Sequence, residues 1–215
     1  PTEAQRTSIE SVRVSEPFAD ALAFQAYSKL PLYSQQLIGA WCISLVKRLG
    51  VFYDMRVGKT KTAWVAMKAA IASGEIDFFV VVCPRTNMYD PWLPELEANG
   101  FDVVVLDGTT AEDEEAIFLR NRERWSPREY AKGPTVYVLN YERVGSRLPL
   151  MTEHWDMTRI GVVADETSAI KNPKANRSRA MHALCETPPY VVLLNGTPME
   201  QGPHDLWSQM RCVDS

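Results

Sequence analysis

Two acidic residues follow directly after an apolar run in this chain of 215 residues. Ile160–Ala164 reads as a buried strand, and Asp165 and Glu166 stand at its carboxyl end. Proteins with parallel α/β sheets place their ligand-binding and catalytic groups at this end of the strands. A buried carboxylate is costly unless a cation or hydrogen bonds compensate for its lost hydration. The pair therefore indicates a site for a divalent metal and a nucleotide, provided that other residues hold the phosphates.

Gly58-Lys59-Thr60 supplies the residue types that hold phosphate. The segment lies between a predicted strand and a predicted helix, which is the setting of a P-loop. Gly58 would let the main chain approach phosphate oxygens, and the amino end of the helix would present its unpaired N–H groups. Lys59 would place a cation on the β- and γ-phosphates, and Thr60 would offer its hydroxyl to Mg²⁺. The full P-loop pattern has glycine where this chain has Tyr53, so the entry to the loop departs from it.

With a nucleotide bound at Lys59, the two acids acquire distinct roles. Asp165 would hold the metal together with Thr60, directly or through a water molecule. Glu166 would orient and deprotonate the attacking water of a hydrolysing enzyme. An Asp–Glu pair that merely opens a surface loop is the alternative, and the apolar run before it favours the functional interpretation. The predicted catalytic residues are thus Lys59, Asp165 and Glu166.

The elements that must position these residues alternate along the chain. Strands are predicted at Val51–Tyr53, Asp77–Cys83, Asp102–Leu106, Thr135–Leu139, Ile160–Ala164 and Tyr190–Leu194. Helices are predicted at Phe18–Tyr27, Leu37–Leu49, Thr62–Ala72, Tyr89–Ala98, Ala111–Arg124 and Ala175–Cys185. Strands that alternate with helices favour a parallel sheet covered on both faces. The sequence therefore predicts one α/β domain.

The composition excludes several classes of protein. With 46% hydrophobic and 23% charged residues, the chain fits a globular domain, and no apolar run approaches the ~20 residues of a membrane helix. The four cysteines are scattered without a Cys-x-x-Cys spacing, which favours buried thiols in a reducing compartment. The three histidines show no metal-ligand spacing. The net charge of −4 argues only weakly against nucleic-acid binding, because a local basic patch suffices.

Five segments, in order along the chain, carry a more specific signal. They are Asp54-Met55 with Gly58–Thr60, Val82–Pro84 with Trp92 and Glu95-Leu96, Asn140–Arg143, Asp165–Lys174 with Ser178, and Leu194–Pro198 with Asp205–Trp207. They resemble motif I, motif Ia, the segment before motif II, motif II and motif III of the Swi/Snf-type translocases of helicase superfamily two. The resemblance implies a three-layer, RecA-like P-loop lobe with a mostly parallel central sheet. Such a lobe belongs to an ATP-driven motor on duplex nucleic acid, usually DNA.

The resemblance also implies roles for particular residues. Those expected to bind ATP with Mg²⁺ are Gln36, Arg56, Val57, Gly58, Lys59, Thr60 and Lys61. Among these, Gln36 fits the glutamine that reads adenine, with Tyr33 beside it, although an exposed helical glutamine is the alternative. Those expected to contact the nucleic-acid backbone, with ordinary loop residues as the alternative, are Arg85, Thr86 and Asn140. Those expected to couple the nucleotide site to motif III are Ser168, Gly196 and Thr197.

Two departures from the family pattern bear on activity. Arg56 stands where the family has glycine in motif I, a variation seen among phage-encoded relatives, so we consider a phage origin. Thr167-Ser168 stands where the family has Ala-His or Gly-His. That histidine helps to couple the nucleotide site to motif III, so the coupling in this chain must differ or be lost.

The resemblance divides the chain into an N-terminal extension, residues 1–30, and a helicase ATP-binding lobe, residues 31–215. The family motor needs a second RecA-like lobe, which brings an arginine that accelerates phosphoryl transfer about 1000-fold or more. We expect that lobe in cis or in trans, and little ATP hydrolysis without it. The expected location is the cytoplasm of a bacterium or phage-infected cell, or the nucleus of a eukaryote, with no membrane association. A nucleotide- or partner-binding module that does not hydrolyse ATP is the alternative; a small-molecule kinase would explain neither motif II nor motif III.

Overall fold

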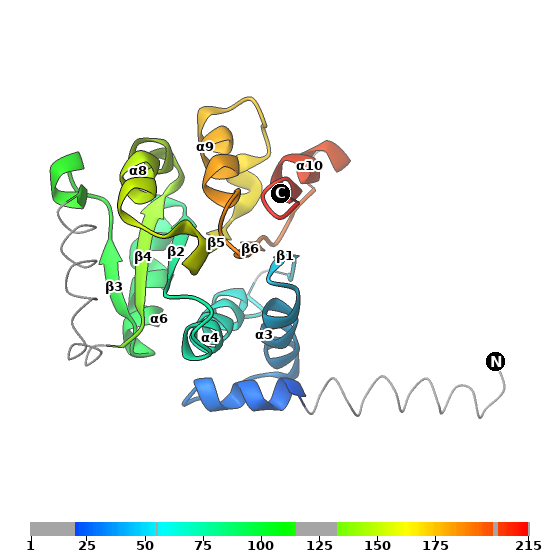
Figure 1. Cartoon of the computed structure of the whole chain (residues 1–215). Helices are drawn as coiled ribbons and strands as arrows, with labels where there is room; N and C mark the ends of the chain where they lie inside the picture. The colour runs from blue at the N-terminus through cyan, green and yellow to red at the C-terminus, as the bar shows by residue number, and fades with distance from the viewer. Residues whose placement is uncertain (1–19, 55, 115–132, 200–201, 215) are drawn as a thin grey trace.

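A computed structural model of the chain describes residues 20–54, 56–114, 133–199 and 202–214. These residues form a six-stranded sheet with helices on both faces (Figure 1). Every strand pair is parallel, and the strand order is β1-β6-β5-β2-β4-β3. The predicted three-layer α/β class is therefore confirmed, with a sheet that is wholly rather than mostly parallel.

The elements have the following bounds. The strands are β1 (Arg48–Val51), β2 (Phe78–Cys83), β3 (Asp102–Val105), β4 (Thr135–Asn140), β5 (Ile160–Asp165) and β6 (Tyr190–Leu194). The α-helices are α3 (Ser34–Val46), α4 (Lys59–Ala72), α5 (Arg85–Asn87), α6 (Leu93–Ala98), α8 (Tyr141–His154), α9 (Asn176–Cys185) and α10 (Pro203–Met210). Short helices of other types are η1 (Ala23–Tyr27), η2 (Met88–Trp92), η4 (Met157–Arg159) and η5 (Thr167–Ile170).

The apolar runs form the sheet interior because both of its faces are covered. Every residue of β2, β5 and β6 is buried. Successive side chains of a strand point to opposite faces, so Phe79 and Val81 pack with α3, α4 and α6. Phe78 and Val80 pack with α8 and α9 on the other face. Figure 1 shows these two helical layers below and above the sheet.

The prediction for the segment between α3 and β1 is wrong by about three residues. The expected helix Leu37–Leu49 ends at Val46, and Lys47 turns the chain with a φ of 66°. Arg48–Val51 then forms the edge strand β1, which pairs with β6, so the expected strand Val51–Tyr53 begins earlier. The Arg48 guanidinium donates to the carbonyls of residues 185, 188, 212 and 213 and so fixes this strand to the distant C-terminal part.

Other helix predictions also change. The expected helix Tyr89–Ala98 is divided, because Asp90 has non-helical backbone angles and α6 starts only at Leu93. Helices α8 and α10 were not predicted as elements. The expected helix Ala111–Arg124 is described only as far as residue 114, and residues 1–19 of the expected extension and Met55 of motif I lie outside the described residues. Within the described parts, no helix has the length and apolarity needed to cross a membrane.

Candidate functional site

The parallel sheet brings the predicted site residues to one edge. In a parallel sheet the loops that follow the strands all leave at the carboxyl ends. The loop after β1 ends at Gly58, Lys59 follows as the first residue of α4, and the loop after β5 begins at Glu166. Strand β6 lies between β1 and β5 in the sheet, so its following loop, which starts at Asn195, separates the other two. The structure thus places the P-loop match and the acid pair on the two flanks of the motif III match.

The P-loop match has the backbone that a phosphate cradle requires. Gly58 is the N-cap of α4 and has a φ of 85°, in the left-handed region that favours glycine. A Cβ atom there would lie 2.1 Å from Nε2 of Gln36, so a larger residue would collide with that side chain. The ammonium of Lys59 donates to the carbonyl oxygens of Tyr53, at 3.0 Å, and Asp54, at 3.1 Å. The side chain of Lys59 therefore folds back over the loop that precedes α4. The N–H groups at the amino end of α4 follow directly after that loop.

The buried side chain of Gln36 joins the start of α3 to this loop. Its Oε1 accepts from the N–H of Tyr33 at 3.0 Å, and its Nε2 donates to the carbonyl of Val57 at 3.5 Å. The ring of Tyr33 is 70% exposed beside it, as stacking on a flat ligand would require. Recognition of adenine by Gln36 stays a prediction. Lys61 donates to the carbonyl of Pro31, so its ammonium is engaged with the segment before α3.

The carboxylate of Asp165 is held from several sides. It is buried, and its Oδ2 accepts from Nε1 of Trp92 at 2.9 Å and from Nδ2 of Asn87 at 3.4 Å. The hydroxyl of Tyr141 donates to its main-chain oxygen at 2.7 Å. Burial, and then the nearby charge of Asp165, raise the pKa of the Cys83 thiol far above its usual range. The sequence motifs include Trp92, but no local spacing indicates that it contacts the acid.

The second acid stands at a strained point of the backbone. Glu166 has a φ of 51° and precedes η5. The next residue, Thr167, is fully buried and donates its hydroxyl to Oε1 of Gln209 in α10, at 2.6 Å. The same Oε1 accepts from Nδ2 of Asn195 at 3.0 Å. The hydrogen bonds that join the loop after β5 to the loop after β6 therefore pass through Thr167, which the sequence marks only as a departure from the family pattern, and through Gln209, which it does not mark at all.

The other expected coupling residues lie in these same loops. Ser168 is half-buried in η5, and its main-chain oxygen accepts from the N–H of Lys171. Thr197 donates its N–H to Oδ1 of Asn195 at 3.1 Å, with Gly196 between them. Coupling through these residues stays a prediction. The side chain of Gln209 has no local sequence signal that would reveal its contacts, because it approaches from a later helix.

The residues expected to contact nucleic acid have unequal exposure. The side chain of Arg85 is 70% exposed and pairs with Asp107 at 2.9 Å. Thr86 is exposed next to it and donates to Oδ1 of Asn87. Asn140 is only 5% exposed, and its Oδ1 accepts from the N–H of Arg143 and caps α8. This cap gives Asn140 a structural role, and its contact with a phosphate stays a prediction.

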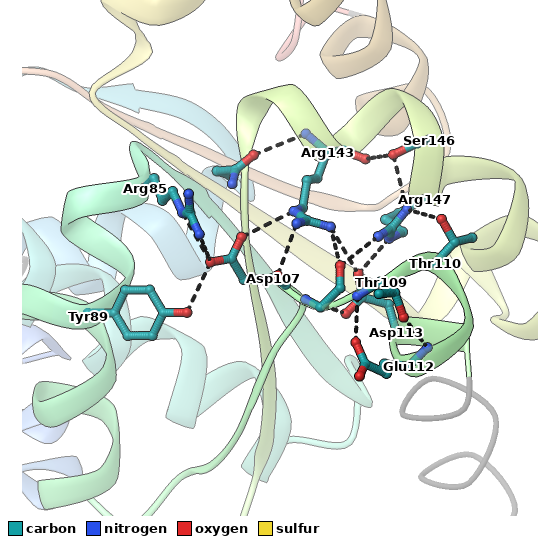
Figure 2. A network of polar contacts seen from close by, with 12 residues as sticks. Arg85, Tyr89, Asp107, Thr109, Thr110, Glu112, Asp113, Arg143, Ser146 and Arg147 are labelled. Carbon is teal, nitrogen blue, oxygen red and sulfur yellow. Dashed lines mark hydrogen bonds and ion pairs between the residues drawn. The ribbon is translucent and has the colours of Figure 1, made fainter.

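An ion-pair network that sequence reasoning missed surrounds Asp107 (Figure 2). Its Oδ1 accepts from Nε of Arg143 at 3.1 Å, and its Oδ2 accepts from Arg85 and from the hydroxyl of Tyr89. Burial alone would raise the pKa of Asp107, but these hydrogen bonds and the two arginine charges together hold it below its usual range. The network lines a hollow of about 740 Å³ beside the start of α8.

A second ion pair, between Arg147 and Asp113, is buried beneath the same network. Nε of Arg147 donates to Oδ2 of Asp113 at 2.6 Å, and both side chains are almost wholly buried. Arg147 also donates to the hydroxyl of Thr110 and the carbonyl of Gly108. The pair therefore anchors the loop after β3 to α8. Arg143 and Arg147 thus donate to carboxylate, hydroxyl and carbonyl oxygens of the protein around this hollow.

The donor set suits a metal that is held mainly by its nucleotide. Within the described residues, no three His, Cys, Asp or Glu side chains gather into a metal site. Magnesium keeps few protein ligands and takes its other oxygens from phosphates and water. Asp165 at the end of β5 and Thr60 in the first turn of α4 fit that requirement. The left-handed Gly58 and the ammonium of Lys59 fit the phosphates.

The sequence profile of the SNF2-related domain matches residues 35–213. In structure, the chain is similar to a Sulfolobus solfataricus SWI2/SNF2 ATPase core in complex with dsDNA, with a TM-score of 0.65 and 21% identity over 86% of this chain and 36% of that one. The SWI2/SNF2 ATPase core domain of the same organism matches with a TM-score of 0.55 and 22% identity, over 86% of this chain and 35% of that one.

A curated relative in Caenorhabditis elegans is named a homolog of SWI/SNF-related matrix-associated actin-dependent regulator of chromatin subfamily A-like protein 1. It is 29% identical over 135 residues, which are 63% of this chain and 17% of the relative. The chain thus spans about a sixth of the length of that relative. The structural matches confirm the fold of a RecA-like lobe. None of the comparisons supports a phage origin.

Proposed function

This chain belongs to the SNF2-related domain family, and we propose that it is the ATP-binding lobe of an ATP-dependent translocase on duplex DNA. The observation that supports this most strongly is the meeting of two features at one sheet edge. Lys59 opens α4 after a left-handed glycine, and the buried carboxylate of Asp165 ends β5. With magnesium and a second RecA-like lobe, the same site would hydrolyse ATP.

The contacts of Lys59 indicate how the lobe would receive phosphate. Its ammonium donates to the carbonyls of Tyr53 and Asp54, which are weaker acceptors than the charged oxygens of a phosphate. On binding, the ammonium would exchange these carbonyls for the β- and γ-phosphates. The N–H groups at the amino end of α4 would add hydrogen bonds and a favourable dipole.

Asp165 and Glu166 would have different roles in the reaction. Trp92 and Asn87 orient Oδ2 of Asp165, which leaves Oδ1 to face the metal or its water. Magnesium, when bound with ATP, would neutralise charge on the transferring phosphate. Glu166, next in the chain, would accept the proton of the attacking water. The second lobe would supply the arginine that this reaction requires.

DNA would contact the exposed Arg85 and Thr86 after β2. Contacts to phosphate position a protein on DNA without reading its sequence, which suits a motor that moves along the duplex. The similar archaeal core was solved with dsDNA, which supports a duplex partner for this chain. Such a motor does not need to separate the two strands of the DNA duplex.

Magnesium-dependent nucleotide binding tests the proposal. We expect Mg-ATP to raise the melting temperature of the chain, and Lys59→Ala to abolish the shift. Lys68→Ala is the matched control, because this lysine lies on the same helix with its ammonium over the ring of Trp64. ATP hydrolysis should rise when a second lobe and duplex DNA are added. Strong unstimulated turnover that survives Lys59→Ala would refute the assignment.

A lobe that binds nucleotide without hydrolysing it is the second candidate. The replacement of the family histidine by Ser168 favours it, because that residue helps to couple the site to motif III. Binding without turnover, even with a second lobe and duplex DNA present, would select this candidate over the first.

A further inference from the structure

Gln209 of α10 is a fully buried amide with every hydrogen-bonding position occupied. Its Oε1 accepts from the hydroxyl of Thr167 and from Nδ2 of Asn195. Its Nε2 donates to the carbonyls of Pro198 and Asp205, both at 2.8 Å. The reverse orientation of the amide would direct its N–H groups at an amide donor and its oxygen at two carbonyls. The four partners therefore determine how this side chain lies.

Three of these four partners belong to the two loops that follow β5 and β6, and the fourth, Asp205, lies in α10 itself. Thr167 directly follows Glu166 in the loop after β5, and Asn195 and Pro198 belong to the loop after β6. Thr167, Asn195 and Gln209 are each 0% exposed. Hydrogen bonds shielded from water are stronger than exposed ones and cannot be replaced by solvent. The three side chains thus join the two loops rigidly.

Glu166 stands between two anchored neighbours. On one side, the hydroxyl of Tyr141 holds the main-chain oxygen of Asp165. On the other side, Gln209 holds Thr167. A residue other than glycine with a φ of 51° is strained, and it keeps that conformation only when its surroundings impose it. The bond from Thr167 to Gln209 is one of the contacts that impose it.

We propose that Gln209, through Thr167, is the positioning residue that aims Glu166 and links it to the loop after β6. The inference rests on the proposed function, because Glu166 acts only where ATP is hydrolysed. It assigns the linking role to residues other than Ser168, which stands at the place of the family histidine. Gln209 and Thr167 touch no substrate; they act through the acid and the loop.

Thr167→Val tests the inference, because valine keeps the shape of threonine and removes its hydroxyl. Asn195 still donates to Gln209 in this variant, so the buried amide keeps a partner and the fold is retained. ATPase rates are measured with the second lobe and duplex DNA supplied. We expect kcat to fall about fivefold to tenfold, as the loss of one hydrogen bond implies, with KM unchanged within about twofold.

The second readout is hydrogen exchange on the chain with and without Mg-ATP. In the wild type, nucleotide should slow the exchange of the Thr197 amide in the loop after β6. In Thr167→Val this slowing should disappear, although Mg-ATP still binds. Thr167→Ser keeps the hydroxyl and should restore both readouts. Ser28→Ala, which removes a buried hydroxyl bond from the C-cap of η1, should alter neither.

Each other outcome is informative. An unchanged kcat and unchanged protection in Thr167→Val would overturn the inference while leaving the proposed function in place. A serine variant as slow as the valine variant would also overturn it, because the hydroxyl would then not be the cause. Failure of the wild-type chain to bind Mg-ATP would overturn the proposed function itself, and the inference with it.

Discussion

Replacement of Trp92 by phenylalanine is a direct test of how Asp165, the acid proposed to hold magnesium, is oriented. The indole is fully buried, and its Nε1 donates to Oδ2 of Asp165 at 2.9 Å. Phenylalanine keeps an aromatic ring there but removes the N–H group and part of the volume. A hydrogen bond to a charged group contributes about 1.5–3 kcal/mol. With a small cavity added, we expect the free energy of unfolding to fall by about 2–4 kcal/mol.

The effect on nucleotide binding should be more specific. Removal of a group that orients a metal-binding side chain typically costs about 10- to 100-fold in metal affinity. Asn87 still donates to the same oxygen from 3.4 Å, so the loss should lie near the lower end, at about tenfold. Calorimetric titration of Mg-ATP into Trp92→Phe, repeated with EDTA in place of magnesium, measures it. The loss of nucleotide affinity should appear only in the titration with magnesium.

The fold provides a matched control in Trp64. This tryptophan of α4 is 1% exposed, and its Nε1 donates to Oε2 of Glu95 at 3.0 Å. Trp64→Phe therefore loses the same N–H group and the same volume without touching Asp165. Urea denaturation should show a similar loss of stability in both variants, but only Trp92→Phe should bind Mg-ATP more weakly. Equal affinities in the two variants would refute the reasoning.

The network around α8 supports two further predictions. Arg147→Met should lower the free energy of unfolding in urea by about 3 kcal/mol, because it removes the nearer cation from the buried carboxylate of Asp113 and leaves it with the more distant Arg143, at 3.6 Å; a loss below about 1 kcal/mol would contradict this. Asp107→Asn should flatten the acid dependence of the melting temperature. Because the folded state depresses the pKa of Asp107, its stabilisation is present above the usual value of 3.8 and is lost as the pH falls through the lower folded value. The difference between wild type and variant should therefore shrink below about pH 4, and a constant difference would contradict the prediction.

Most of the sheet could be predicted from local patterns. Tyr190–Leu194 has the predicted bounds, and Phe78–Cys83 differs by one residue, because a continuous apolar run between polar segments suits only a fully covered strand. The boundary between α3 and β1 could not be predicted in the same way. Leu45, Val46 and Leu49 satisfy helical spacing, and only the pairing of β1 with β6 decides where the helix ends.

In the candidate site, too, residues marked by their sequence neighbours could be predicted, and residues brought in by distant contacts could not. Lys59 and Asp165 could be identified from the residues next to them in the sequence. The side chains that hold the acid loop in place come from other elements: Trp92 of η2 donates to Asp165, and Gln209 of α10 accepts from Thr167. Their contacts depend on how helices pack over the sheet edge, which no spacing in the sequence specifies.

The contact between Arg85 and Asp107 would affect the thermodynamics of the proposed DNA binding. The exposed guanidinium of Arg85 is already paired with the carboxylate of Asp107, which acts as its counterion. A lysine or arginine that neutralises a phosphate normally releases condensed cations from DNA, and this release makes affinity fall steeply with salt. When Arg85 contacts a phosphate, it gives up a carboxylate in exchange. If DNA is the partner, as proposed, the attraction through this residue would be smaller than its charge suggests, and the proposed motor would be less prone to bind tightly and stall.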